Sequence, residues 1–419
     1  EVYYALFQND QGQKLYQYAY NPELPLKPEK ELTVYTLYDQ ATINQAATLF
    51  QKKHPDTMVS VHVACADTDD KEAETQRNRL MTSLAAGDGE DVIVLSGLDD
   101  NALAKKGVLM DLSDIVTPME ENGELLQAIV DGEKAADGKQ QILPVRFALP
   151  LLLSKEKRAS EMTDLAALAK AAEQTDGSLL GTFTGEDLVE TFAPYFMPDI
   201  IKDKQLDTEK LRTVLQELQT IAAHCDMVEK YKKGERASNE WDLPSAMQAV
   251  LCQISGFNDA MFDLAIINLV KGDYTSFENA YIPTVEIGVN ANTKQADLAK
   301  EFAAFVMSRE VQDGDFYDGF PVNKESLHMQ VSLDRSDYAA YTTIEGADGQ
   351  EIGLDIEPIK AADADKLEAL CDSLSKKTVK DAKVLEELKK SVPDYLLGRQ
   401  SLDDTISKIQ DGVKIYLAE

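Results

Sequence analysis

An early part of the chain alternates between two hydrophobic periodicities, and this alternation constrains the fold more than any other feature. Residues 32–37, 59–63 and 91–95 are apolar or alternate at every second position, as strands do. Residues 43–50 and 80–84, which lie between them, repeat at helical spacing. The last strand is almost wholly apolar, which is typical of a strand buried in a parallel sheet. The order strand, helix, strand, helix, strand predicts a doubly wound α/β lobe.

The pattern changes after residues 143–147, an extended segment that contains Pro144. Residues 155–275 are mostly helical by periodicity, with a clear apolar stripe that begins at Leu211 and continues to Ala222. At 419 residues the chain is also too long for one ordinary core, because domains usually hold about 100 to 200 residues. We therefore expect a second lobe.

The first residues differ from everything after them. Residues 2–7 and 14–20 are tyrosine-rich runs with strand propensity, and the turn-forming residues 9–12 separate them, which predicts a hairpin. Three prolines between residues 22 and 28 predict a stiff linker. Because a lone hairpin is only marginally stable, we expect residues 1–30 either to pack on the main body or to belong to an upstream β domain.

The charge balance is strongly acidic: 42 Lys and Arg against 74 Asp and Glu give a net charge of -32. Such a surface repels phosphate backbones and anionic lipid headgroups, so nucleic acids and membrane surfaces are not expected partners. The longest apolar stretches, at residues 147–153 and 264–270, are far shorter than the roughly 18 residues that cross a bilayer. The sequence does not begin with a signal peptide, which would be a basic segment followed by an apolar one. Because exported proteins lose this peptide, the compartment is not decided by its absence.

The sequence lacks the motifs of the common enzyme classes. Residues 132–139 resemble a phosphate loop, but five residues separate the two glycines where four are required. Residues 67–78 begin like a calcium loop, yet Glu72 replaces the required Gly. The four histidines are isolated, so we expect no catalytic residue, metal or cofactor. The four cysteines are not spaced as metal ligands or as a redox pair either; they are Cys65, Cys225, Cys252 and Cys371.

Several segments of the sequence resemble family 1 extracellular solute-binding proteins of ABC importers, a family that includes the maltose-binding type and many Gram-positive lipoproteins. The first group of segments comprises residues 32–37, 50–55, 84–93 and 106–112. A second group, in the order and spacing of the family, comprises residues 287–294, 299–306, 310–312 and 319–323, and the helix that opens Ser401-Leu402-Asp403-Asp404 fits too. Glu90 departs from the family, which usually has Pro before this strand, and residues 1–28 lie outside its pattern.

The resemblance implies a two-lobed periplasmic-binding-protein-like α/β fold of type II, in which each lobe is a doubly wound sheet flanked by helices, with the N-terminal β-hairpin as an addition. The implied boundaries are residues 31–145 plus 284–321 for the N-terminal lobe and residues 146–283 plus 322–419 for the C-terminal lobe. Crossovers between the lobes are expected near residues 144–150, 281–285 and 319–323.

The resemblance also implies a function. A monomer would capture a small-molecule solute outside the cytoplasm, close its lobes around it and present it to the transmembrane permease subunits of an ABC importer. Saccharide is the favoured ligand, and a peptide or a polyamine is the alternative. No enzymatic activity and no cofactor are implied. The protein would be attached to the membrane only through a lipid anchor, at the cell surface of a Gram-positive bacterium.

Ligand contacts are expected beyond the carboxyl ends of the first-lobe strands, where open α/β sheets bind ligands. Carboxylates there would accept hydrogen bonds from sugar hydroxyls, and aromatic faces would pack on the sugar. The structural alternatives are helix capping for the aspartates, burial in a core for the second-lobe aromatics, and a carboxylate partner for Arg146 in the first crossover. The candidates are Tyr38, Asp39, Asp67, Asp69, Ser96 and Asp99 in the first lobe and Tyr195 and Trp241 in the second.

Two other functions fit the residues. A glycan-active hydrolase would use two of the many carboxylates at glycosidase separation, and sustained product formation would reveal it. A ligand-sensing or adhesion protein on the same fold would account for the extra hairpin.

Overall fold

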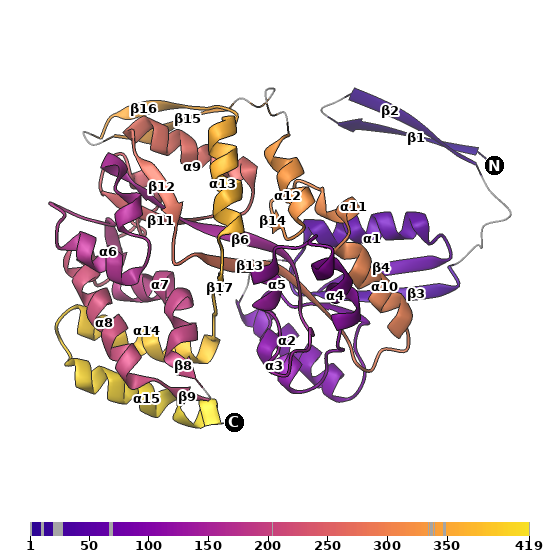
Figure 1. Ribbon diagram of the computed structural model, residues 1–419, viewed down its shortest axis with the longest axis horizontal. Coiled ribbons are helices and arrows are strands. Elements are labelled where there is room, and N and C mark those ends of the chain that lie inside the picture. The colour runs from indigo at the N-terminus through magenta and orange to yellow at the C-terminus, as the bar shows by residue number, and fades with distance from the viewer. Residues whose placement is uncertain are drawn as a thin grey trace.

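The computed structural model describes residues 2–9, 12–19, 28–66, 70–202, 204–333, 335, 338, 340–346 and 349–418. Figure 1 shows a body of two halves joined by long strands, with the N-terminal hairpin standing apart from it. The strands are β1 (Val2–Asn9), β2 (Gly12–Ala19), β3 (Lys30–Thr36), β4 (Thr57–Val63), β5 (Val92–Val94), β6 (Leu143–Ser154), β7 (Thr182–Thr184), β8 (Ile201–Lys202), β9 (Gln205–Leu206), β10 (Asp226–Val228), β11 (Ala249–Ile254), β12 (Asp273–Ser276), β13 (Ala280–Val289), β14 (Phe320–Pro321), β15 (Ala340–Glu345), β16 (Glu351–Ile356) and β17 (Lys376–Lys377). The α-helices are α1 (Ala41–Lys53), α2 (Asp70–Ala85), α3 (Asp100–Lys105), α4 (Ser113–Glu121), α5 (Gln127–Asp131), α6 (Leu165–Ala172), α7 (Gly185–Ile200), α8 (Thr208–Ala223), α9 (Phe257–Val270), α10 (Ala296–Val306), α11 (Arg309–Gln312), α12 (Lys324–Val331), α13 (Ala361–Asp372), α14 (Ala382–Leu396) and α15 (Leu402–Ala418).

The first lobe is built around the parallel strands β3, β4 and β5, with β3 between the other two. Helix α1 buries Ile43, Ala46 and Phe50 against this sheet, as their helical spacing predicts. Helix α10 packs beside α1, where the rings of Phe50 and Phe302 meet edge to face with centroids 5.3 Å apart. The predicted alternation of strands and helices is confirmed for this lobe.

The two lobes are joined by strands that lie side by side. The first half of β6 pairs with β13 and β14, and its second half pairs with β11 and β12. Phe147 in β6 is opposite both Pro283 of β13 and Phe320 of β14, so the three predicted crossover segments meet at one place. The register of β13 against β6 shifts twice between Pro283 and Glu286. We call this irregular segment, residues 283–286, the hinge.

The second lobe has a buried core of its own, formed by helices α6, α7, α8, α14 and α15. The predicted apolar stripe of α8 lies in this core, and Leu211, Leu215 and Leu218 are fully buried. Strands β11 and β12 of this lobe pair antiparallel with β6, whereas β7 and β10 pair with each other in parallel. Helix α15 begins as predicted, because the Ser401 hydroxyl accepts a hydrogen bond from the backbone N–H of Asp404 at 3.1 Å.

The predicted N-terminal hairpin is confirmed. Strands β1 and β2 pair antiparallel from Val2 opposite Ala19 to Asn9 opposite Gly12. Its large apolar side chains are exposed, with 65% of Tyr3 and 67% of Leu15 open to solvent. The described side chains of the hairpin do not belong to any of the buried clusters of the body.

Candidate ligand-binding site

Loops that follow two strands of the first lobe come together at one edge of the sheet. Because β3 and β5 are parallel, their carboxyl ends lie at the same edge. Gly97, in the loop after β5, has a φ of +79°, and a Cβ atom there would lie 3.4 Å from the Tyr38 ring after β3. Glycine adopts this positive φ without strain, and the loop after β5 therefore turns beside the half-buried ring of Tyr38.

The same loop is tied to the hinge. The Ser96 hydroxyl donates a hydrogen bond to the backbone carbonyl oxygen of Thr284 at 2.7 Å. The Thr284 hydroxyl is buried and has no hydrogen-bond partner among the described residues. A Cβ atom on Gly319 would clash with this hydroxyl, so the third crossover also reaches the same point. A ligand that contacts the loop after β5 therefore touches a segment coupled directly to the hinge.

A loop that precedes β14, residues 314–319, connects the two lobes. The Asp318 carboxylate accepts hydrogen bonds from the Thr42 N–H at 2.7 Å and the Thr42 hydroxyl at 2.8 Å, at the start of α1. The Asp315 carboxylate accepts from the Asn258 amide at 3.3 Å, at the start of α9 in the second lobe. The loop also carries Tyr317, which is 75% exposed. Sequence reasoning missed this loop as a site, although its density of acidic and aromatic residues was a visible signal.

Arg146 contacts this loop through a hydrogen bond and an aromatic ring. Its Nε donates to the Thr42 hydroxyl at 3.1 Å, and its Nη2 donates to the carbonyl oxygens of Val311 and Gly314. The guanidinium lies over the Phe316 ring, 5.5 Å from its centroid. Burial lowers the pKa of Arg146 to about 10, against the opposing effect of nearby acidic residues. The expected carboxylate partner is therefore wrong: among the described residues its hydrogen bonds go to a hydroxyl and two carbonyl oxygens.

Strand-end loops joined to a hinge between two lobes are the arrangement expected for a solute-binding protein. The model of the bacterial extracellular solute-binding protein family matches residues 36–313, more than half of the chain. The chain belongs to this family. A comparison with curated protein sequences finds no significant match for this solute-binding protein.

Solved structures of binding proteins share the fold at low sequence identity. A sugar transporter from Rhizobium etli in an open conformation has a TM-score of 0.61 and 15% identity, with 92% of this chain and 99% of that chain covered. The sugar-binding protein MalE from Xanthomonas citri has a TM-score of 0.62 and 14% identity, with 93% and 97% covered. A substrate-binding protein from Listeria monocytogenes in complex with cycloalternan has a TM-score of 0.56 and 14% identity, with 93% and 99% covered. The family and these structures are of binding proteins, and the two-lobed fold class is confirmed.

The candidate aspartates of the first lobe have different surroundings in this solute-binding protein. Asp39 is exposed beside Tyr38 and accepts a hydrogen bond from the Asn44 amide at 2.8 Å. It does not cap α1, whose first turn is instead capped by Asp318. Asp99 is exposed and does cap α3, because its carboxylate accepts from the Ala102 N–H at 2.8 Å. Asp67 and Asp69 lie outside the described residues.

The two aromatic candidates of the second lobe lie in or against its packed interior. Tyr195 is 6% exposed, and its ring meets that of Phe277 edge to face with centroids 5.2 Å apart. Burial raises the pKa of Tyr195. Trp241 is half-buried in a short 3-10 helix, Glu240–Asp242, and its ring centroid lies 6.4 Å from that of Phe262. Tyr195 is therefore a core residue, and Trp241 packs against α9.

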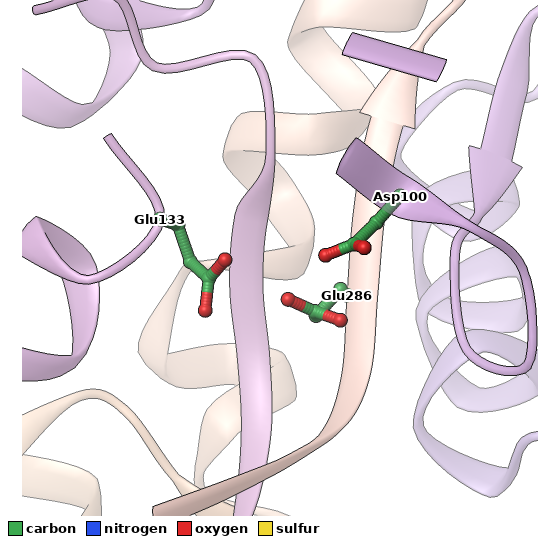
Figure 2. A group of neighbouring side chains, drawn as sticks. All are labelled: Asp100, Glu133 and Glu286. Atoms are coloured by element: carbon green, nitrogen blue, oxygen red, sulfur yellow. The ribbon is translucent and has the colours of Figure 1, made fainter. Parts of the chain in front are cut away.

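One group of carboxylates has the chemistry of a metal site. Figure 2 shows Asp100 of α3, Glu133 after α5 and Glu286 of β13, whose ligand oxygens all lie within 4.8 Å of one another. Burial raises the pKa of both Glu133 and Glu286. The Lys377 Nζ lies 3.0 Å from Asp100 Oδ2 and 3.0 Å from Glu286 Oε1, and it also bonds to Glu133. An ammonium group therefore already supplies the cation, and a metal would have to displace it.

In the part of the chain that the structure describes, no helix combines the length and the apolar character that crossing a membrane requires.

Proposed function

We propose that this solute-binding protein captures a saccharide by closing its two lobes around it and delivers it to the transmembrane subunits of an ABC permease. The observation that carries the proposal is the hydrogen bond from Ser96 to Thr284, because it couples a strand-end loop to the hinge. Ligand that bound both lobes would favour the closed form by its differential affinity for that form.

The chemistry of the strand-end loops suits a sugar. Tyr38 presents a half-buried ring, and beside it Asp39 presents an exposed carboxylate. Aromatic rings pack on the C–H face of a sugar, and carboxylates accept from its hydroxyls. Sugars also appear in the descriptions of the structural neighbours, which include the cycloalternan complex and a maltodextrin-binding domain from Bdellovibrio bacteriovorus bound to maltotriose.

The N-terminal lobe comprises residues 31–145 plus 284–321 and the C-terminal lobe residues 146–283 plus 322–419. The protein acts as a monomer at the surface of a Gram-positive bacterium, held by a lipid anchor. Its ligand contacts include Tyr38, Asp39, Ser96 and Asp99, with Asp67 and Asp69 as further contacts from the loop after β4 and Trp241 from the second lobe.

A thermal-stability panel tests the ligand class. Maltotriose, cycloalternan and xylo-oligosaccharides are compared with short basic peptides and spermidine, and the sugar solutions are analysed for products after prolonged incubation. At one hundred times its Kd a ligand stabilises the folded state by about 2.7 kcal/mol. We expect at least one saccharide to raise the unfolding midpoint by several degrees and to remain intact.

A matched pair of variants tests whether the saccharide binds at the carboxyl ends of the first-lobe strands. Asp39→Asn should reduce the saccharide-induced shift, whereas Asp56→Asn should preserve it. Asp56 is an aspartate at the opposite end of the same sheet, where it pairs with Lys30 at 3.2 Å. A shift produced only by peptides or spermidine would refute the saccharide assignment, and steady hydrolysis would establish a glycan-active enzyme instead.

A further inference from the structure

Lys377 belongs to a short strand that is anchored on one side of the hinge. Strand β17 pairs in parallel with Ala280 and Tyr281 of β13, which precede the hinge. The Thr378 N–H also donates to the Tyr281 carbonyl oxygen at 3.0 Å. Figure 1 shows β17 between α14 of the second lobe and α5 of the first. The backbone of Lys377 is therefore fixed to the second-lobe end of β13.

The side chain of Lys377 reaches to the other side of the hinge. Its ammonium group pairs with Asp100, Glu133 and Glu286, and Glu286 is the residue at which the register shifts of β13 end. The carboxylates of Glu133 and Glu286 are only 1% and 9% exposed. Burial opposes the charge of Lys377, but the three acidic neighbours raise its pKa, so the lysine stays charged. Removing one partner of such a buried ion pair would leave an uncompensated charge in the interior, so the pairs are costly to break.

The neighbouring lysine provides a contrast. Lys376 pairs with Asp199 of α7 at 3.0 Å and with Glu278 at 3.0 Å, and both partners lie in the second lobe. Two adjacent lysines on one strand therefore form ion pairs of similar geometry, one set within a lobe and the other across the hinge.

Lys377 of the second lobe contacts the start of α3, which is next to the candidate ligand contact Asp99. Asp100 directly follows Asp99, at the start of α3. On the second-lobe side, the hydroxyl of Tyr416 in α15 donates to Asp381 just before α14 at 2.9 Å. Asp99 is close enough to Tyr416 to contribute to the raised pKa of that phenol, behind the larger effects of burial and Asp381. The start of α3 therefore lies within electrostatic range of the end of α15.

We propose that Lys377 is a positioning residue that sets the angle between the two lobes by pairing with Glu286 of the hinge and with Asp100 and Glu133 of the first lobe. The cluster holds the start of α3 near the end of α15 before any solute binds. Less of the ligand's binding energy is then needed to close the lobes. The effect on affinity rests on the proposed solute-binding function, whereas the effect on the lobe angle does not.

The test compares three variants of the full chain without ligand. Asp100→Asn removes one partner across the hinge but keeps the two buried partners of Lys377. Lys377→Met removes all three pairs, and Lys376→Met is the matched control within the second lobe. Small-angle X-ray scattering gives the radius of gyration of each. We expect it to increase for Asp100→Asn and for Lys377→Met and to be unchanged for Lys376→Met.

A second readout is the Kd for maltotriose, with cycloalternan as the alternative probe. We expect Asp100→Asn to weaken binding about tenfold, within the usual range of conformational coupling, and Lys376→Met to leave the Kd unchanged. Should Lys377→Met fail to fold, the variant that also carries Glu133→Gln and Glu286→Gln removes the unpaired buried charges and serves in its place.

Unchanged scattering for all the hinge variants would overturn the inference, as would an equal change in Lys376→Met. If neither sugar binds the natural chain but the scattering changes as expected, the lobe-angle role of Lys377 stands and the saccharide proposal fails.

Discussion

The Ser96 hydroxyl lies 2.7 Å from the Thr284 carbonyl oxygen and donates a hydrogen bond to it. These residues are far apart in the sequence, in the loop after β5 and in the hinge of β13. The contact ties the loop after β5 directly to the strand that joins the lobes. Small displacements near a hinge are amplified at the far ends of the lobes.

Replacing Ser96 by Ala should weaken saccharide binding clearly while lowering the stability of the protein only slightly. We expect the loss of one hydrogen bond to cost about 1 kcal/mol in the free energy of unfolding, and the Kd for the stabilising saccharide to rise about tenfold. Urea denaturation and isothermal titration measure the two effects. Ser60→Ala is the control, because its hydroxyl donates to Glu31 at 2.9 Å on an exposed part of the sheet. Equal affinity losses in both variants would contradict a role for the Ser96 loop.

The buried carboxyl of Asp263 predicts a pH dependence. Burial, with help from Glu240 and Asp259, raises its pKa to about 8. The folded protein therefore binds this proton more tightly than the unfolded chain, whose aspartates titrate near pH 4. The protein therefore loses stability as the pH rises from about 4 through 8, and above that range the loss is constant.

Asp263→Asn should remove this dependence. At pH 8.5 we expect the variant to be more stable than the natural chain by about 1 to 3 kcal/mol, because it no longer buries a charge. At pH 4.5 the difference should largely disappear. Urea denaturation at both pH values measures it, with Asp88→Asn in an exposed turn as the control. A stability difference that is independent of pH would contradict the assignment.

Tyr195 should behave as a core residue. Tyr195→Ala should lower the free energy of unfolding by about 3 to 5 kcal/mol, the usual cost of deleting a buried aromatic ring. Tyr195→Phe keeps the ring against Phe277 and should leave the saccharide Kd unchanged. A large loss of affinity in a stable Tyr195→Phe protein would show that the hydroxyl contacts the ligand.

The hairpin should be dispensable for the body. Deleting residues 1–27 should change the free energy of unfolding by no more than about 0.5 kcal/mol, since the hairpin's described side chains lie outside the buried clusters. Saccharide affinity should also be unchanged. Calorimetric unfolding of the shortened chain provides the measurement, and a clear loss of stability would mean that the hairpin packs on the body.

Local patterns predicted the elements but not the contacts between distant ones. The alternation of residues 59–63 and the spacing of Ile43, Ala46 and Phe50 report burial on one face, so the strands and helices of the first lobe were predictable. The choice of Ser96 followed from its position after a strand. Whether Tyr195 faces a ligand or a core could not be predicted, because an apolar helix face buries its residues in either case.

Charged contacts were the least predictable feature. Lys377 is separated from Asp100 by 277 positions, and nothing in the local sequence distinguishes it from Lys376. Arg146 lies in an apolar strand, where a carboxylate partner was expected, yet folding provides carbonyl oxygens from α11 and from the turn after it. Such partners depend on how the crossovers come together, and periodicity carries no information about that.

Isothermal titration of the full chain with the saccharide that stabilises it most tests the central claim most directly. We predict saturable binding of one ligand per chain, no turnover, and binding that is weakened in both Asp39→Asn and Ser96→Ala. The absence of heat with every saccharide, or binding that both variants retain unchanged, would contradict capture of a sugar by the strand-end loops.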